Sequence, residues 1–578
     1  MQSSSHLEPL AYDVVIIGAG INGAGIARDA ARRGLRTLLV DKGDFCSGAT
    51  SWSTRLVHGG LRYLEYFEFS LVRESLKERE ILLNIAPHLV DPLLLTIPIY
   101  RDRSRPYWKV QAGMRLYDLL SYDKTLPNHR MLPRSVFHQL YRSVDTEKLA
   151  GGAQYYDAQV AYAERLALEN ILDAEAAGAI VMNYTEVTAL HREGDRISGL
   201  TCRDLRQQST FRVEITPQGT VLNIAGAWVD EVLHRGQRQG EEEMIGKEPM
   251  IGPTKGSHIV VPPFPGAPED CAFYVEAKSD GRPFFIVPWL GLILIGTTDI
   301  KFSGNLDEIK AADSEIDYLI EETNQIFPLA QLSRDQICFT YSGVRPLPYA
   351  EGKKPSSITR SHVLHRHVSD QARNLISLIG GKITTYRQVG EEAVNAVFKQ
   401  MGRQAPPCTT DKTPLPGTMP PEDRRLPSWL QAYRDRLDPG IINALAQIYG
   451  ARTGDLLSLV DASPDLAAPL LEGHPFIAAQ VVFAVQTEYA YSLVDILLRR
   501  TLIAIYGDYG IPLLPRVLQI LQIHCGWSRE QGDRQIRDYC HYMFTHCIPE
   551  YERARYEGEI KEIQKTLAES SPRECVQS

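Results

Sequence analysis

The sequence Gly18–Ala19–Gly20–Ile21–Asn22–Gly23 lies between two segments whose structure is readily predicted. Residues 12–17 before it form a short β-branched run that is typical of a buried parallel strand. Residues 21–33 have the small-residue pattern of a helix, and residues 36–40 indicate a second strand that ends at Asp41. A strand, glycine loop, helix and strand in this order predict a Rossmann-like dinucleotide site at the helix N-terminus.

Each glycine of the loop has a predicted task. Gly18 allows the tight turn, Gly20 lets a pyrophosphate approach backbone N–H groups, and Gly23 lets the helix pack closely on the strand. The carboxylate of Asp41 can accept hydrogen bonds from ribose hydroxyls. The alternative is a plain strand–helix turn with packing glycines. The loop alone does not separate FAD from NAD.

Composition restricts the class of protein. A chain of 578 residues is too long for one hydrophobic core, so two or three domains are expected. The net charge of −9 argues against a nucleic-acid binder that relies on overall positive charge. Nine cysteines without a C-x-x-C pair fit neither a disulfide framework nor a zinc or iron–sulfur pattern, and we predict no metal. We also expect neither a signal peptide nor a membrane-spanning helix.

The periodic patterns and the proline content along the chain predict a division into three parts. We predict a helix over residues 65–85, another over 157–177 and a hairpin over 284–295 of a mainly antiparallel sheet. The division predicted is residues 1–404, a proline-rich linker at 405–428 and a helical domain at 429–578. Because proline fixes φ and removes backbone donors, we expect the linker to be extended and unpacked.

The segment Thr50–Leu64, TSWSTRLVHGGLRYL, is more distinctive than the loop. Together with the loop it closely resembles the FAD-dependent glycerol-3-phosphate dehydrogenases. Further segments resemble the family in the same order, namely residues 255–258, 296–299, 341–347, 358–360, 380–387 and 495–501. Two departures are Asp41, where relatives usually have Glu, and Arg55, where they often have Lys. The chain has neither the cysteine tail of the anaerobic subunit nor the calcium-binding helix–loop–helix of the mitochondrial form, so it resembles the aerobic, single-subunit bacterial type.

The resemblance implies both a fold and a reaction. The fold is α/β, with a Rossmann-like FAD-binding domain interleaved with an antiparallel-sheet (α+β) substrate domain and followed by a C-terminal helical domain. The reaction is hydride transfer from C2 of sn-glycerol 3-phosphate to flavin N5, giving dihydroxyacetone phosphate, with a quinone as the final acceptor. Alternatives are an oxidase that uses O2, an amine or amino-acid oxidase of the same fold, and a non-catalytic flavin-bound sensor.

The resemblance also nominates site residues. Arg62 and Arg360 would bind the phosphate, because a guanidinium can hold phosphate oxygens bidentately, and Tyr63 would contact the substrate. His258 is the candidate general base, and Arg345 would stabilise the developing alkoxide. Lys382 would lie near flavin N5 or the substrate oxygen. The FAD contacts implied beyond the loop are Thr50, Ser51, Ser53, Thr54, Val187, Gly226, Gly380, Gly381 and Thr384.

Each nomination has a structural alternative. The arginines could be surface residues, the histidine could be satisfied within its strand, the paired glycines could serve a simple strand–helix turn, and the hydroxyls could serve turns.

Residues 101–109, RDRSRPYWK, combine basic and aromatic side chains. Tyr and Trp favour the headgroup boundary of a bilayer, and Arg and Lys favour anionic lipid. Because a quinone is lipid-soluble, we expect a cytoplasmic protein that lies peripherally on the inner face of the cell membrane. The alternative is a solvated basic loop. The sequence leaves open whether the chain forms a homo-oligomer.

Overall fold

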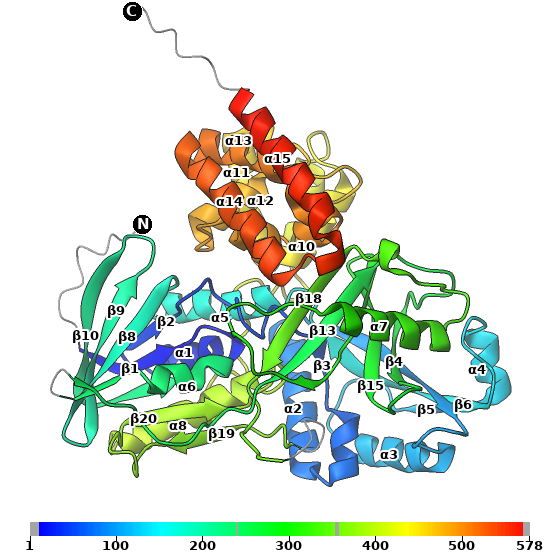
Figure 1. Cartoon of the computed structure of the whole chain (residues 1–578), viewed down its shortest axis with the longest axis horizontal. Coiled ribbons are helices and arrows are strands. Elements are labelled where there is room, and N and C mark those ends of the chain that lie inside the picture. The colour runs from blue at the N-terminus through cyan, green and yellow to red at the C-terminus, as the bar shows by residue number, and fades with distance from the viewer. Residues whose placement is uncertain (1–10, 239–240, 353–357, 570–578) are drawn as a thin grey trace, which may run out of the picture.

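A computed structural model describes residues 11–238, 241–352 and 358–569 of the chain. Two large sheets with their helices lie next to each other, and a bundle of helices stands on top of them (Figure 1). The predicted first unit is confirmed, with β1 at Tyr12–Ile17, α1 at Ile21–Arg32 and β2 at Thr37–Val40. The β-branched residues of β1 are buried, and Gly34 ends the helical segment with a φ of +80°.

The first sheet has ten strands. Besides β1 and β2 these are β7 (Ile180–Met182), β8 (Thr185–Glu193), β9 (Arg196–Asp204), β10 (Ser209–Asn223), β11 (Gly236–Arg238), β12 (Glu241–Glu242), β19 (Val363–Arg366) and β20 (Leu375–Ile379). Its centre is parallel, in the order β20–β10–β1–β2–β7. Helix α1 packs between α5 (Ala163–Ala176) and α8 (Tyr386–Gln400). This close packing depends on small residues, since a Cβ on Gly25 of α1 would lie 2.6 Å from the Tyr386 ring.

The second sheet also has ten strands and is almost entirely antiparallel. These are β3 (Leu56–Val57), β4 (Asp91–Tyr100), β5 (Arg130–Pro133), β6 (Leu149–Gln159), β13 (Thr254–Val261), β14 (Cys271–Glu276), β15 (Pro283–Trp289), β16 (Leu292–Gly296), β17 (Ile300–Lys301) and β18 (Phe339–Arg345). Strands β15 and β16 form the hairpin predicted at residues 284–295. Helix α7 (Asp313–Ile326) packs on β13.

The two sheets are interleaved in sequence. Strands of the first come from residues 12–40, 180–242 and 363–379, and strands of the second come from the segments between them, 56–159 and 254–345. The predicted fold, an α/β nucleotide-binding part interleaved with an antiparallel part and followed by helices, is therefore confirmed.

The two-sheet region contains further helices. They are η2 (Leu61–Tyr66), α2 (Phe69–Ile85), α3 (Tyr107–Leu120), α4 (Arg134–Leu140), η3 (Gly226–Trp228), α6 (Val229–Leu233) and η4 (Arg334–Gln336). The helix predicted over residues 65–85 is thus divided into the end of η2 and α2. No helix in the described part of the chain is long and apolar enough to cross a bilayer.

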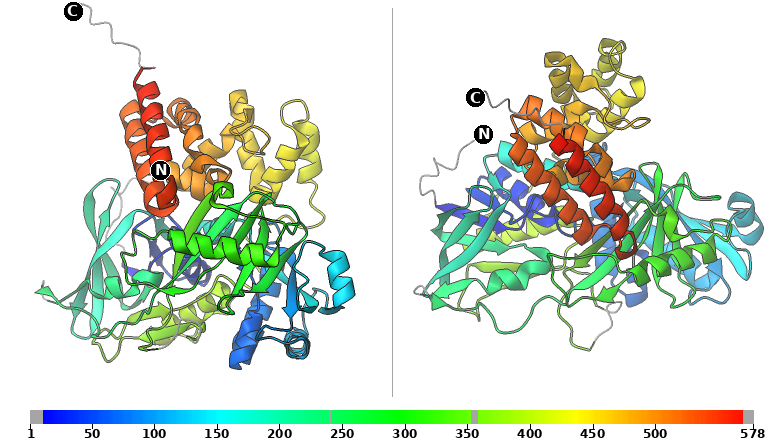
Figure 2. Two further views of the ribbon diagram at one scale, coloured as in Figure 1. Left: turned by 45° about the vertical axis from the view of Figure 1, so that its right-hand side comes forward. Right: turned by 45° about the horizontal axis from the view of Figure 1, so that its top comes forward.

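The C-terminal part is helical, as predicted. It contains α9 (Arg425–Ala432), α10 (Pro439–Tyr449), η6 (Gly450–Arg452), α11 (Thr453–Ala462), η7 (Pro464–Ala467), α12 (Ala478–Thr487), a π-helical turn η8 (Asp495–Arg500), η9 (Ile503–Ile505), η10 (Asp508–Leu513), α13 (Leu514–Cys525), α14 (Arg529–His546), η11 (Glu550–Glu552) and α15 (Arg553–Glu569). Figure 2 shows these helices against the two-sheet region in two further views. One continuous hydrophobic core joins Val14 of β1 to Phe483 of α12 and Tyr539 of α14.

Two predictions about local structure are wrong. Residues 149–159 form β6, so the helix predicted to begin at residue 157 begins at Ala163 instead. The reason is tertiary: β6 pairs with β4 over its whole length, and this pairing overrides the local helical pattern.

The proline-rich segment is the second correction, because it is packed. Leu415 is buried and its N–H donates to the Ile85 carbonyl at 2.8 Å. The N–H of Gly417 donates to the buried carboxylate of Glu169 at 2.9 Å. Helix α9 also begins at Arg425, inside the predicted linker, with Pro427 in its first turn, where proline is tolerated. The prolines remove donors, but the remaining N–H groups tie the segment to the first domain.

Candidate active site

The glycine loop has the geometry that the sequence predicts. Gly18 adopts a φ of +105°, and a Cβ there would lie 2.6 Å from the Ile224 carbonyl oxygen. A Cβ on Gly23 would lie 1.9 Å from the Gly18 oxygen, so only glycine allows α1 to start this close to β1. Gly20 is the N-cap of α1, and a Cβ there would meet only the Thr50 hydroxyl, at 3.3 Å. The N-terminus of α1 is thus kept free of side chains on this side.

Asp41 lies at the end of β2 beside this loop. Its carboxylate accepts the N–H of Ala19 at 2.6 Å and the N–H of Gly43 at 2.9 Å. Burial raises the pKa of Asp41 to about 6, and these two hydrogen bonds oppose the increase. Thr50 contributes a hydroxyl that accepts the Ile21 N–H at 3.0 Å.

A second pair of glycines meets the same helix end. Gly380 and Gly381 have φ values of +79° and +94°, and a Cβ on Gly381 would lie 2.8 Å from the Asn22 amide nitrogen. The buried Asn22 Oδ1 has no hydrogen-bond partner among the residues that the structure describes. Gly226 has a φ of +59° with nothing within 4 Å of its Cβ position. The unpartnered Asn22 oxygen, the glycine backbone without side chains and the open space at Gly226 fit a bound FAD.

Val187 and Ser51 have structural partners of their own. Val187 is buried on β8, and its carbonyl accepts a hydrogen bond from Arg235 at 2.7 Å. The Ser51 hydroxyl is buried and donates to the Cys46 carbonyl at 2.7 Å, so it braces the loop after β2. Their contacts with FAD stay predictions.

His258 lies in β13 between β16 and β18 and is only 2% exposed. Its ring stacks on Tyr341 with centroids 4.6 Å apart, and its Nε2 is 2.9 Å from the Thr54 hydroxyl. Its Nδ1 has no hydrogen-bond partner in the described part of the chain. Burial, followed by the positive charges of Arg345 and Arg55, holds the pKa of His258 well below its usual value. The imidazole is therefore neutral near pH 7, as a general base must be.

Two predicted arginines meet at one carboxylate. Arg345, at the end of β18, lies 3.2 Å from Asp299 Oδ1, and Arg360 lies 3.3 Å from Asp299 Oδ2. The buried Nη1 of Arg360 finds no hydrogen-bond partner within residues 11–238, 241–352 and 358–569. Asp299 holds the two guanidinium groups together. The sequence prediction missed this role, although Asp299 is part of a segment that carried the resemblance.

Tyr63 stands at the centre of the positive charge. It lies on η2 next to Arg62, and the Lys382 ammonium is 4.7 Å from the centre of its ring. Burial raises the pKa of Tyr63, while the nearby charges of Arg360, Arg62 and Arg345 lower it. Lys382 donates to the Ser75 hydroxyl at 2.9 Å, and its burial lowers its pKa to about 8. The side chains of Arg62, Arg345, Arg360 and Lys382 thus gather around Tyr63 in one positively charged cluster.

The remaining predicted residues link the two halves of the site. The Thr384 hydroxyl accepts the His58 N–H at 3.2 Å and so joins the segment after β20 to the segment that carries Tyr63. The Ser53 carbonyl accepts the Tyr341 hydroxyl at 2.7 Å, and the Ser53 hydroxyl accepts the Arg55 N–H at 3.3 Å. Ser53 therefore supports the ring on which His258 stacks.

Arg55, the departure from the family pattern, is structural. It is 2% exposed, makes a two-pronged ion pair with Glu164, and stacks 4.8 Å above the Trp289 ring. The planar guanidinium serves both contacts at once, which an ammonium group cannot do.

The helical domain contacts the loop after β2 through Asp44, which lies three residues after Asp41. Arg500 donates to both oxygens of the Asp44 carboxylate at 2.8 Å, and Arg499 donates to Oδ2 at 2.6 Å. Burial alone raises the pKa of Asp44, but Arg500 and Arg499 outweigh it and hold the pKa at about 2. Sequence reasoning did not find this contact, because its partners are more than 450 residues apart.

Comparison with known proteins places the chain among flavoenzymes. Residues 13–384 match the family described as FAD dependent oxidoreductase, and residues 408–532 match the C-terminal domain of alpha-glycerophosphate oxidase. The glycerol-3-phosphate dehydrogenase of Synechocystis sp. is 55% identical over 95% of this chain and 100% of its own length. The D-erythritol 1-phosphate dehydrogenase of Brucella abortus is 37% identical over 86% of this chain and 95% of its own. The crystal structure of glycerol-3-phosphate dehydrogenase from Bacillus halodurans, complexed with FAD, has a TM-score of 0.72 at 26% identity and covers 93% of this chain and 95% of its own.

Proposed function

The chain belongs to the family of FAD-dependent glycerol-3-phosphate dehydrogenases, and on this premise we propose that it oxidises sn-glycerol 3-phosphate to dihydroxyacetone phosphate and passes the electrons to a membrane quinone. FAD is its cofactor. The observation that carries the proposal is the cluster of Arg62, Arg345, Arg360 and Lys382 around Tyr63.

The cluster suits a phosphorylated alcohol. Arg62 and Arg360 bind the phosphate dianion through planar N–H pairs, and the free Nη1 of Arg360 is one donor available for it. Asp299 neutralises part of the charge of Arg345 and Arg360 and fixes their orientation before the substrate arrives. The phosphate group anchors one end of the molecule, so the secondary alcohol is positioned beside His258 and Arg345.

Chemistry at the alcohol needs a base and an electrostatic stabiliser. FAD, when bound, supplies the hydride acceptor at N5. His258 takes the hydroxyl proton, and its Nδ1 is the nitrogen without another partner. Arg345 stabilises the negative charge that develops on the oxygen, and its own ion pair with Asp299 keeps it in place.

His258→Ala should lower the rate of flavin reduction by about 10²–10⁴-fold and remove the acid limb of the pH profile. In the parent, protonation of His258 abolishes the base, so activity falls as pH falls through the His258 pKa. Because that pKa is depressed, the limb of kcat/KM should lie well below pH 6.5. His524→Ala, at a partly buried histidine of the helical domain, is the control. A limb that survives in His258→Ala rules this residue out as the base.

Lys382 should produce the alkaline limb of the pH profile of kcat/KM. Its charge is present below a pKa of about 8 and is lost as pH rises through that value, so kcat/KM should decrease there. Lys382→Arg keeps the charge and should move this limb to higher pH, whereas Lys382→Met should abolish it and lower kcat/KM by about 10²-fold or more. Lys77→Met, at an exposed lysine on α2, should change neither. An unmoved limb in Lys382→Arg contradicts the assignment.

The acceptor and the location are proposed from an exposed apolar surface next to the site. Helix η2 carries Arg62 and Tyr63 and ends at Tyr66, with Phe67 directly after it, and Tyr66 and Phe67 are 45% and 77% exposed. The neighbouring α2 and α3 region adds further exposed apolar side chains, namely Phe69, Trp108, Leu119 and Tyr122. These residues, which lie in the blue elements α2 and α3 and beside them (Figure 1), form what we call the η2–α3 surface. Such a patch suits insertion into the headgroup region on the cytoplasmic side of a membrane.

The basic segment at residues 101–109, which led us to expect membrane contact, contributes less to this proposal. Arg105 is engaged in ion pairs with Glu65 and Glu276, both at 2.9 Å, and Lys109 pairs with Glu65. Arg101 is exposed and is available to anionic lipid. The apolar side chains therefore contribute more than the arginines to the proposed membrane contact.

Phe67→Ser and Trp108→Ser should each weaken binding to anionic vesicles, by about ten- to hundredfold if the side chain is fully buried in the lipid. Ile523→Ser changes an apolar residue that is 64% exposed on the helical domain, so it is the matched control and should bind normally. Flotation with phosphatidylglycerol-containing vesicles measures this. Equal flotation of all three variants would remove the η2–α3 surface as the membrane contact.

Two competing activities can be separated by assay. An oxidase would reduce O2 to peroxide at a rate comparable with quinone reduction, whereas the proposed enzyme reduces a soluble ubiquinone or menaquinone analogue much faster. The similarity to an erythritol 1-phosphate enzyme makes a four-carbon polyol phosphate the second candidate substrate. A higher kcat/KM for erythritol 1-phosphate than for glycerol 3-phosphate would replace the proposed substrate by the longer one.

A further inference from the structure

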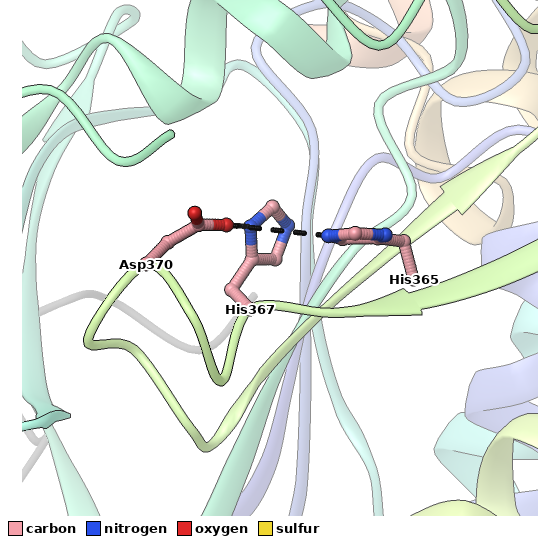
Figure 3. Close-up of side chains that lie close together, drawn as sticks. All are labelled: His365, His367 and Asp370. Carbon is pink, nitrogen blue, oxygen red and sulfur yellow. Dashed lines mark hydrogen bonds and ion pairs between the residues drawn. The ribbon is translucent and has the colours of Figure 1, made fainter. Parts of the chain in front are cut away.

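Two histidines and an aspartate gather at the turn of the hairpin formed by β19 and β20. His365 is in β19, and His367 follows directly after the end of this strand, with the centroids of the two rings 4.7 Å apart. Asp370 lies in the turn that leads to β20. Its Oδ2 is 2.8 Å from His367 Nδ1 and 4.0 Å from His365 Nε2 (Figure 3). One ligand atom of each residue lies within 4.8 Å of the other two.

We propose that His365, His367 and Asp370 bind one divalent transition-metal ion of the zinc class. Two imidazoles and a carboxylate form a ligand set that zinc, cobalt, nickel and copper prefer over magnesium or calcium. A tetrahedral zinc ion holds its ligand atoms about 2.0–2.2 Å from itself, so the widest pair here needs to close by about 1 Å. The His365 side chain is 40% exposed and can make this movement, and water can fill the fourth position.

The surroundings of His367 favour this assignment. Its side chain is 1% exposed, and its Nε2 is 2.9 Å from the hydroxyl of Ser377, a buried residue of β20. If Nε2 donates its hydrogen to Ser377, the lone pair of Nδ1 faces Asp370. Ligating histidines are usually held by such a second hydrogen bond, which fixes the tautomer and the ring orientation.

The Asp370 carboxylate is also available. Arg192 is the nearby cation, but it donates to the Asp370 backbone carbonyl at 3.2 Å, and its own side chain forms an ion pair with Glu243. Within the described residues, the hydrogen bonds and ion pairs of the Asp370 carboxylate involve only the two histidines. No lysine or arginine in the described part of the chain therefore neutralises this carboxylate directly.

An ion bound here would stabilise the turn between β19 and β20 and would take no part in the proposed reaction. The N–H of His367 donates to the Leu375 carbonyl at 3.2 Å, at the start of β20. Gly381, whose Cβ position lies against Asn22 of α1, follows the other end of the same strand. Binding would fix the turn between β19 and β20, where metal coordination closes the loop. This inference does not depend on the proposed substrate.

The test uses the full-length, FAD-loaded protein after removal of metal with a chelator. Calorimetric titration with ZnCl2 should give one saturable site per chain. His365→Ala and Asp370→Asn should weaken that site by at least about tenfold, and Ser377→Ala should weaken it by about 10–100-fold through loss of the second hydrogen bond. His524→Ala should bind zinc like the parent, because the His524–Asp465 pair has no third ligand among the residues that the structure describes.

The results that overturn the proposal are equally definite. A parent without saturable zinc binding, or a His365→Ala variant that binds as tightly as the parent, refutes the site. FAD content and thermal unfolding in the absence of zinc establish that each variant is folded. Because the His365 side chain is 40% exposed, His365→Ala is the variant whose folding should change least. X-ray absorption at the zinc edge of the loaded parent should show two imidazole ligands, and a first shell without them also refutes the site.

Discussion

Arg345→Ala is expected to slow the reduction of bound FAD by glycerol 3-phosphate by about 10²–10³-fold and to leave the FAD content unchanged. Arg345 ends β18 and is fixed by Asp299 and by the Thr297 hydroxyl at 3.1 Å. It has no hydrogen bond or ion pair with the glycine loop around α1. The loss should therefore fall on the chemistry and not on cofactor binding. Anaerobic stopped-flow spectroscopy of the flavin absorbance measures the rate.

A second readout separates catalysis from general damage. Because the charge of Arg345 lowers the pKa of His258, its removal should raise that pKa and move the acid limb of kcat/KM to higher pH. Arg345→Lys should retain part of the rate, since it keeps the charge but loses the planar fork. Arg334→Ala, which breaks an exposed ion pair on η4, is the control. Reduction at the parental rate in Arg345→Ala would refute its role.

Asp44→Ala is expected to destabilise the protein by about 3–5 kcal/mol and to release FAD more readily. The substitution leaves two guanidinium groups, on Arg499 and Arg500, buried without their shared carboxylate. The affected loop also carries Thr50, whose hydroxyl accepts the first N–H of α1. The helical domain should therefore separate from the nucleotide-binding domain at lower temperature. Calorimetry and FAD fluorescence during heating follow the two events.

The matched control is Asp465→Ala, which breaks the exposed pair with His524 and should cost about 0–1 kcal/mol. The acid dependence gives a further check. The pKa of Asp44 is lowered to about 2, so its contribution is present above its unfolded value of about 3.9 and is lost as pH falls towards 2. Equal unfolding temperatures for Asp44→Ala and the parent would show that this contact does not hold the domains together.

Local sequence signals predicted the elements that depend on local patterns. The β1–α1–β2 unit and the β15–β16 hairpin lie within a residue or two of their predicted bounds, because strand periodicity and glycine turns are encoded nearby. Strand β6 was missed because its stability comes from pairing with β4, about 60 residues earlier. The packed proline segment was missed because its partners, Ile85 and Glu169, lie in distant helices.

The functional site, too, was predicted where local motifs mark it and missed where distant partners define it. Its predicted residues lie in motifs, and the structure brings Tyr63, Arg345, Arg360 and Lys382 together. Asp299 and Asn22 lay inside segments already singled out and could have been found by asking what opposes the charge or faces the helix end. Asp44 carried no local signal, since its side-chain partners are Asn183 and the arginines of η8, which lie far along the chain.

The most direct test of the central claim is anaerobic addition of sn-glycerol 3-phosphate to the FAD-loaded protein. The oxidised-flavin absorbance should be lost, with one substrate molecule consumed per FAD and dihydroxyacetone phosphate as the product. Glycerol without the phosphate should reduce the flavin far more slowly, because the arginine cluster around Tyr63 then has no anion to bind. Oxidised flavin that persists in the presence of saturating glycerol 3-phosphate would contradict the proposed activity.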